Sequence, residues 1–204
     1  MNLVNISEHT FIDKDFRNKK INIIDLGACL GEFSGEISRI VGECSKIIMI
    51  EANPVNFDKI PNIENSVKLN RFISTEKDGS TNFLIDPNSP YNGSALFSYF
   101  QDGVSYDISN ITLSEIVSLF NIERIDLMKI DIEGAEYSLL ENLSDEILDI
   151  TDQITVEFHD FIDPEYKERT QEIVNKMKNF GYSVINNGLD YKYGSDYYDT
   201  LFYK

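Results

Sequence analysis

The chain has few cysteines and no long apolar run. Two cysteines in 204 residues, Cys29 and Cys44, cannot build a disulfide framework, so we expect both to be reduced. No run approaches the ~20 apolar residues that span a bilayer. The N-terminus, MNLVNISEHTF, lacks the charged-then-apolar form of a signal peptide. We therefore expect a cytoplasmic protein.

Positive charge is also scarce. The chain carries 18 Lys and Arg against 35 Asp and Glu, a net charge of −17 with a pI near 4.4. Proteins that bind nucleic acids or anionic membranes neutralise phosphates with Lys and Arg, so we exclude both as partners. A local basic pocket for one sugar phosphate stays compatible with this charge. The length fits one domain, 1–204, without an internal repeat or linker.

A glycine turn joins the first predicted strand to a helical pattern. Asp25 stands two residues before Gly27-x-x-x-Gly31, and turns of this kind expose backbone N–H groups to a ligand. Position 29 is Cys, whereas the dinucleotide fingerprint has a middle glycine there, which argues against a nicotinamide cofactor. Asp25 would suit an ammonium group. On its own, the motif fits an ordinary tight turn equally well.

The next strand, 46–50, ends in Glu51. A carboxylate at this place can accept both ribose hydroxyls of a nucleoside, although strands also end in solvated Glu. Taken together, Asp25 and Glu51 fit a nucleoside that carries an amino acid. The sequence therefore predicts S-adenosylmethionine as the cofactor.

Strand and helix patterns alternate along the chain, which indicates a mostly parallel sheet with both faces covered. We expect 1–20 to form a turn or short helix at the sheet's edge, with His9 on the surface. The third strand, 67–73, ends at Ser74, and 75–107 is an insertion with short strands and an acceptor loop. Two last strands, 182–185 and 199–203, are expected to pair antiparallel at an edge.

Polar residues follow the fourth and fifth strands, where ligands bind in such sheets. Asp131 and Glu133 come from one strand, and Glu157 and His159 from the other. We expect His159 to act as the base for an acceptor hydroxyl, with Asp131 or Glu133 performing or orienting that step and Glu157 beside it. These groups could equally hold Mg²⁺, but no metal is predicted. Helix capping is the structural alternative for Asp131.

Two neighbours of this cluster have simpler explanations. Glu136 lies in the first turn of the next helix, where a carboxylate favours the helix dipole. Lys129, on a buried strand, is expected to pair with one of the acids, and we also list it as a candidate contact for the acceptor.

Four segments, 24–27, 50–54, 92–96 and 126–136, resemble the FkbM-type family of S-adenosylmethionine-dependent methyltransferases. The resemblance implies a Rossmann-like seven-stranded methyltransferase sheet, mostly parallel with an antiparallel C-terminal edge strand, helices on both faces and a small β insertion between strands 3 and 4. It also implies which residues bind each part of the ligands. The methionine half is assigned to Asp25, Gly27, Ala28 and Gly31, the ribose to Glu51, the adenine side to Ala52, Asn53, Phe72 and Ser74, and the acceptor to Tyr91, Asn92, Ser94 and Lys129.

The resemblance further implies O-methylation of a sugar hydroxyl in a glycan, a capsule or a nucleotide-activated sugar. The chain has little before its first strand, where relatives often carry more, so its acceptor pocket is expected to be open or completed by a second subunit in a homodimer. Two alternatives stay open. One is a nicotinamide-dependent oxidoreductase on the same βαβ unit, and the other is a non-catalytic nucleoside-binding protein.

Overall fold

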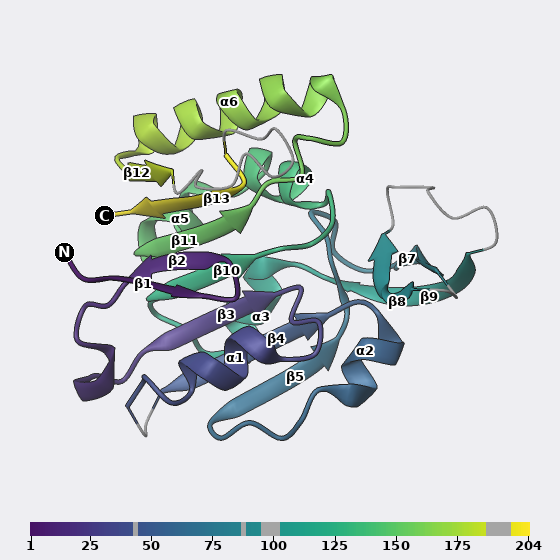
Figure 1. Cartoon of the computed structure of the whole chain (residues 1–204), viewed down its shortest axis with the longest axis horizontal. Helices are drawn as coiled ribbons and strands as arrows, with labels where there is room; N and C mark the ends of the chain where they lie inside the picture. The colour runs from purple at the N-terminus through teal and green to yellow at the C-terminus, as the bar shows by residue number, and fades with distance from the viewer. Residues whose placement is uncertain (43–44, 87–88, 95–102, 187–196) are drawn as a thin grey trace.

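The computed structural model describes residues 1–42, 45–86, 89–94, 103–186 and 197–204, with backbone only for 89–92. Its centre is a seven-stranded sheet in the order β12-β13-β11-β10-β3-β4-β5 (Figure 1). The strands are Asn22–Leu26 (β3), Lys46–Glu51 (β4), Ser66–Asn70 (β5), Leu127–Ile130 (β10), Gln153–Glu157 (β11), Ser183–Asn186 (β12) and Asp199–Tyr203 (β13). The alternating pattern of the sequence is thus confirmed as an α/β sheet.

The sheet is parallel except at β13, which pairs antiparallel with both β11 and β12. The antiparallel strand therefore lies one place inside the edge, and β12 is the edge strand itself. The order of the parallel strands reverses between β3 and β10. Crevices beyond the carboxyl ends of strands at such a reversal are where α/β sheets bind ligands.

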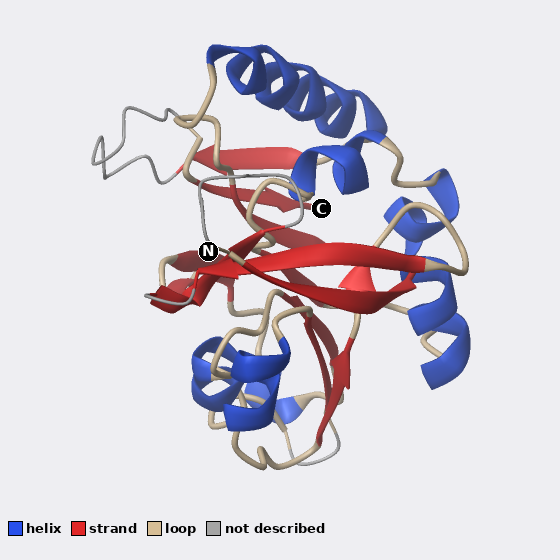
Figure 2. Ribbon diagram, turned by 90° about the vertical axis from the view of Figure 1, so that its right-hand side faces the viewer, coloured by secondary structure: helices blue, strands red, loops and turns tan. Residues whose placement is uncertain are grey.

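Helices cover both faces because buried residues alternate along the strands (Figure 2). On β3, Ile24 and Leu26 join a core with the helices of one face, whereas Ile23 joins the core of the other face. The helices on the face of Ile24 and Leu26 are Leu113–Phe120 (α3), Glu136–Glu141 (α4), Asp145–Ile150 (α5) and Pro164–Phe180 (α6). The helices on the face of Ile23 are Glu32–Ile37 (α1) and Pro54–Lys59 (α2). Among the described residues, no helix is long and apolar enough to cross a membrane.

The first residues form an antiparallel hairpin, Leu3–Ile6 (β1) and His9–Ile12 (β2), followed by a 3-10 turn at Phe16–Asn18. Thr10 Oγ1 donates to Asp199 Oδ2 at 2.6 Å, and the Ile12 N–H donates to Gln153 Oε1 at 2.8 Å. These bonds hold the hairpin against β11 and β13. The predicted edge turn or helix is therefore wrong, and so is the surface position of His9, which is 1% exposed.

A second sheet stands beside the carboxyl ends of the main sheet, in the order β6-β9-β7-β8 (Figure 1). Its strands are Phe72–Ile73 (β6), Ser80–Asp86 (β7), Ser89–Ser94 (β8) and Val104–Ile111 (β9). The predicted third strand is divided at Arg71: β5 stays in the main sheet and β6 pairs parallel with β9. Asn70 Nδ2 donates to the carbonyls of Glu51 and Ala52 at this point, which anchors the division.

Candidate active site

The glycine turn after β3 packs directly against the end of β10. Gly27 has φ +78°, and a Cβ placed there would lie 1.6 Å from the carbonyl oxygen of Asp131. The N–H groups of Gly27 and Ala28 donate to the Ile50 carbonyl at 2.9 and 3.0 Å. Only glycine fits this contact, because any side chain would collide with backbone. The turn thereby joins the carboxyl ends of β3, β4 and β10.

Asp25 lies inside the protein beneath this turn. It is 0% exposed, accepts a hydrogen bond from Ser34 Oγ at 2.6 Å and lies 3.5 Å from Lys129 Nζ. Lys129 also donates to the Gly27 carbonyl at 2.6 Å and lies 3.4 Å from Asp131 Oδ2. Asp25 and Lys129 thus form an internal support for the turn. The sequence predicts that Asp25 contacts the ammonium group of the cofactor and that Lys129 contacts the acceptor. In the structure both side chains are enclosed, and neither lies in the described lining of the pocket.

Glu51 bridges the turns after β3 and β4. Its Oε2 accepts from the Cys29 N–H at 2.6 Å and its Oε1 from the Asn53 N–H at 2.7 Å. Burial raises the pKa of Glu51 to about 7, although both backbone donors favour the charged form. Asn53 in turn caps α2, because its Oδ1 accepts from the Val55 and Asn56 N–H groups.

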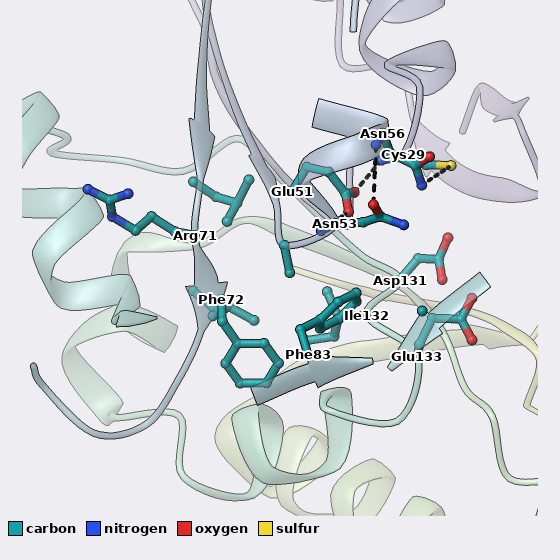
Figure 3. Close-up of a pocket in the computed structure, with 15 residues that line it drawn as sticks. Cys29, Glu51, Asn53, Asn56, Arg71, Phe72, Phe83, Asp131, Ile132 and Glu133 are labelled. Atoms are coloured by element: carbon teal, nitrogen blue, oxygen red, sulfur yellow. Dashed lines mark hydrogen bonds between the residues drawn. The ribbon is translucent and has the colours of Figure 1, made fainter. Parts of the chain in front are cut away.

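A pocket of about 630 Å³ opens between these turns and the second sheet (Figure 3). One side carries Glu51 and Asn53, the opposite side carries Phe83 and Ile132, and Asp131 and Glu133 lie at one end. The described lining comprises Gly27, Cys29, Ile50, Glu51, Ala52, Asn53, Asn56, Arg71, Phe72, Ile73, Phe83, Gly93, Asp131, Ile132 and Glu133.

His159 lies next to this end of the pocket and is held by Glu136. Glu136 is 0% exposed, and its Oε1 accepts from the His159 backbone N–H at 3.2 Å and lies 2.9 Å from Nδ1. Its Oε2 accepts from the Gly134 N–H at 2.7 Å. The other ring nitrogen, Nε2, lies 3.5 Å from Glu133 Oε2 and 3.7 Å from Glu157 Oε1. Glu136 therefore orients the imidazole toward the two acids.

The charges in this cluster shift one another's pKa values. Burial alone would lower the pKa of His159, but the hydrogen bond and charge of Glu136, together with the charges of Glu133 and Asp131, raise it to about 10. Burial, followed by the charge of Asp131, raises the pKa of Glu157. Although burial opposes it, the ammonium of Lys129 and the histidines hold the pKa of Asp131 well below its usual range.

Among the residues that the structure describes, two overlapping groups could hold a metal ion. His9, Asp131 and Glu157 bring ligand atoms within 4.8 Å of one another, and so do Asp131, Glu133 and His159. Asp131 belongs to both groups.

The family comparison identifies the domain that carries this site. Residues 25–184 match the model of the methyltransferase FkbM domain. The chain belongs to the FkbM methyltransferase family. The predicted family and its cofactor, S-adenosylmethionine, are thereby confirmed, and methyl transfer takes the place of the oxidoreductase alternative.

The fold of the FkbM domain is similar to that of a solved methyltransferase. Precorrin-6y C5,15-methyltransferase from Geobacter metallireducens GS-15 superposes with a TM-score of 0.50 at 12% identity, covering 93% of this chain and 84% of its own. The O-methyltransferase from Bacillus cereus in complex with SAH reaches 0.48 at 13% identity, covering 90% and 74%. The first supports the Rossmann-like fold alone. No curated protein matches the chain significantly.

The FkbM domain places the residues predicted from sequence in three groups. In or beside the pocket lie Gly27, Glu51, Ala52, Asn53, Phe72, Asp131, Glu133, Glu157 and His159. Outside its described lining lie Asp25, Ala28, Gly31, Ser74, Ser94 and Lys129. The side chains of Tyr91 and Asn92 lie outside the described residues.

Two of the residues outside the lining, Gly31 and Ser94, stabilise the structure around the pocket. Gly31 has φ +80° and precedes α1 as its N-cap. Ser94 Oγ donates to the Glu133 carbonyl at 3.0 Å, which connects the second sheet to the loop after β10. Ser94 therefore supports an active-site loop.

Sequence patterns do not reveal several residues of the FkbM site. Phe83 enters the pocket from the second sheet and passes close to Gly93, where a Cβ would lie 2.5 Å from its ring. The pairing of β7 with β8 decides this contact, so no local pattern could reveal it. Glu136 holds His159, a role that its place in the first turn of a helix does not predict. His9 comes within 3.9 Å of Asp131, through its Nε2, because the hairpin folds over the sheet.

Proposed function

We propose that this FkbM methyltransferase transfers a methyl group from S-adenosylmethionine to a sugar hydroxyl. The observation that carries the proposal is the pocket at the strand-order reversal, which joins Gly27 and Glu51 to Asp131 and Glu133. Glu51 accepts the ribose hydroxyls, since a carboxylate has about four acceptor sites and two are used by backbone N–H groups. The adenine lies against Phe72 and Phe83.

Methyl transfer needs little beyond alignment and removal of one proton, because the sulfonium is already activated. The methyl group passes from sulfur to the acceptor oxygen, leaving S-adenosylhomocysteine, while the hydroxyl proton passes to a base. His159, with a pKa of about 10, is protonated near neutral pH and is a poor base in this state. We assign the base to Glu157, because its pKa, raised to about 8, lies closer to neutral pH than that of His159, and its ionised form can accept the proton.

A neutral sugar suits the acceptor side better than an anionic one. Asp131 and Glu133 line that end of the pocket and can accept hydrogen bonds from hydroxyl groups, whereas they repel phosphates and carboxylates. The choice of a sugar among neutral alcohols rests on the family resemblance. It is tested by screening free, glycan-linked and nucleotide-activated sugars for methylated products by mass spectrometry.

Calorimetric titration with S-adenosylhomocysteine and, in parallel, NAD tests the cofactor site. We expect the first alone to bind. Glu51→Gln should weaken binding by about 1.5–3 kcal/mol, because one charge-assisted hydrogen bond to ribose is lost. Glu32→Gln, an exposed substitution in the first turn of α1, is the matched control. Binding of NAD would contradict the proposed function and favour an oxidoreductase. Binding of neither ligand would favour a non-catalytic protein.

A further inference from the structure

Acidic side chains outnumber basic ones around Asp131. Carboxylate oxygens of Glu133, Glu136 and Glu157 all lie within 4 Å of the His159 ring nitrogens. Asp131 forms an ion pair with Lys129, at 3.4 Å. Lys129 also forms an ion pair with Asp25, so its positive charge is divided between two carboxylates. Glu136 is fully enclosed and the Glu157 side chain is 15% exposed, so their negative charge is unfavourable unless a cation or protons compensate it.

His159 has the arrangement of a metal-binding histidine. Glu136 Oε1 accepts a hydrogen bond from the Nδ1–H of His159. When a metal ion displaces the proton on Nε2, the lone pair of that nitrogen faces Glu133 and Asp131. Histidines that ligate metals almost always donate their other ring N–H to such a carboxylate, which fixes the tautomer and the ring orientation.

A second imidazole points at the same carboxylate. His9 is 1% exposed, its Nδ1 has no hydrogen-bond partner in the described structure, and its Nε2 lies 3.9 Å from Asp131 Oδ2. A buried ring nitrogen without a hydrogen bond is costly, and this ring borders a cluster of potential ligands. Lys129 occupies the same side of Asp131 at 3.4 Å, where its ammonium would repel an ion. The position between Glu133 and His159 is therefore the better one.

We propose that Asp131, Glu133 and His159 bind a divalent metal ion at the methyl-transfer site. The mixed oxygen and nitrogen ligands suit an ion of the Mn²⁺ type, since carboxylates favour Mg²⁺ and Mn²⁺ and imidazole favours the transition metals. This inference rests on the proposed function: the ion would bind the acceptor oxygen and acidify its hydroxyl, whose proton passes to Glu157.

Binding of Mn²⁺ to the purified, chelator-treated chain tests the site without an activity assay. Loss of the free-ion electron paramagnetic resonance spectrum should show one saturable ion per chain. Asp131→Asn and Glu133→Gln should each lower the affinity by roughly tenfold or more. The Glu133 side chain is 49% exposed, so its replacement is not a change in the core. Glu172→Gln, on the exposed surface of α6, should bind as the parent does.

Absence of saturable Mn²⁺ binding by the folded parent would overturn the proposal, and so would undiminished binding by Glu133→Gln. Titration of the same metal-free protein with S-adenosylhomocysteine separates this failure from that of the proposed function. If S-adenosylhomocysteine binds but Mn²⁺ does not, the proposed cofactor site stands and the proposed metal site is wrong.

Discussion

The contact between Glu136 and His159 allows a pH-dependent prediction. Glu136→Gln removes a buried charge that accepts from both the backbone N–H and Nδ1 of His159. The pKa of His159 rises from 6.5 to about 10, and this shift is equivalent to about 5 kcal/mol at 1.36 kcal/mol per unit. Breaking one partner of a buried pair costs about 3–5 kcal/mol. We expect the variant to lose about that much free energy of unfolding at pH 6.

The sign of the pH dependence follows from the direction of the shift. A histidine whose pKa is raised by folding stabilises the protein fully below pH 6.5, and this contribution is lost as the pH rises through about 10. The parent should therefore lose stability across this interval, by at most about 1.4 kcal/mol per pH unit. In the variant only the part of this decline that Glu133 and Asp131 cause remains, so the difference in stability between the two proteins should shrink toward pH 10.

Urea unfolding at pH 6, 8 and 10, with a chelator present, measures this difference. Glu141→Gln is the control, because its ion pair with Arg169 is partly exposed and worth about 0–1 kcal/mol. The chain has only two histidines, so NMR titration of labelled imidazoles can follow His159 directly. A stability difference as large at pH 10 as at pH 6 would refute the electrostatic explanation.

Two further predictions concern the loops around the pocket. Gly27→Ala should destabilise by several kcal/mol or prevent folding, because its Cβ meets the Asp131 carbonyl, whereas Gly181→Ala, at φ +109° with open space, should cost only about 1 kcal/mol in thermal unfolding. A Gly27→Ala variant as stable as the parent would mean that the turn rearranges. Ser94→Ala should lower turnover but not the affinity for S-adenosylhomocysteine, since it releases the Glu133 loop while leaving Glu51 in place. Equal turnover would show that the hydrogen bond does not position the loop.

Local patterns were sufficient for much of the fold. The bounds of the helix Pro164–Phe180 follow from its local sequence, with Asp163 as its cap and Gly181 at its end, because capping and positive φ are properties of a few adjacent residues. The strand predicted at 67–73 shows the limit. Its residue pattern is continuous, but the chain changes sheets at Arg71 because β6 finds a partner in β9, which lies far along the sequence.

The order of strands and helices, the glycine turn and the carboxyl-end position of Glu51 and Asp131 can be inferred from the sequence, because each depends on periodicity or on a short motif. Which charges meet depends on the folded structure. Asp25 pairs with Lys129 through the register of β3 and β10, and the hairpin brings His9 to Asp131. Pairing of buried charges depends on distances between segments remote in the chain, and these distances set the pKa values on which the chemistry depends.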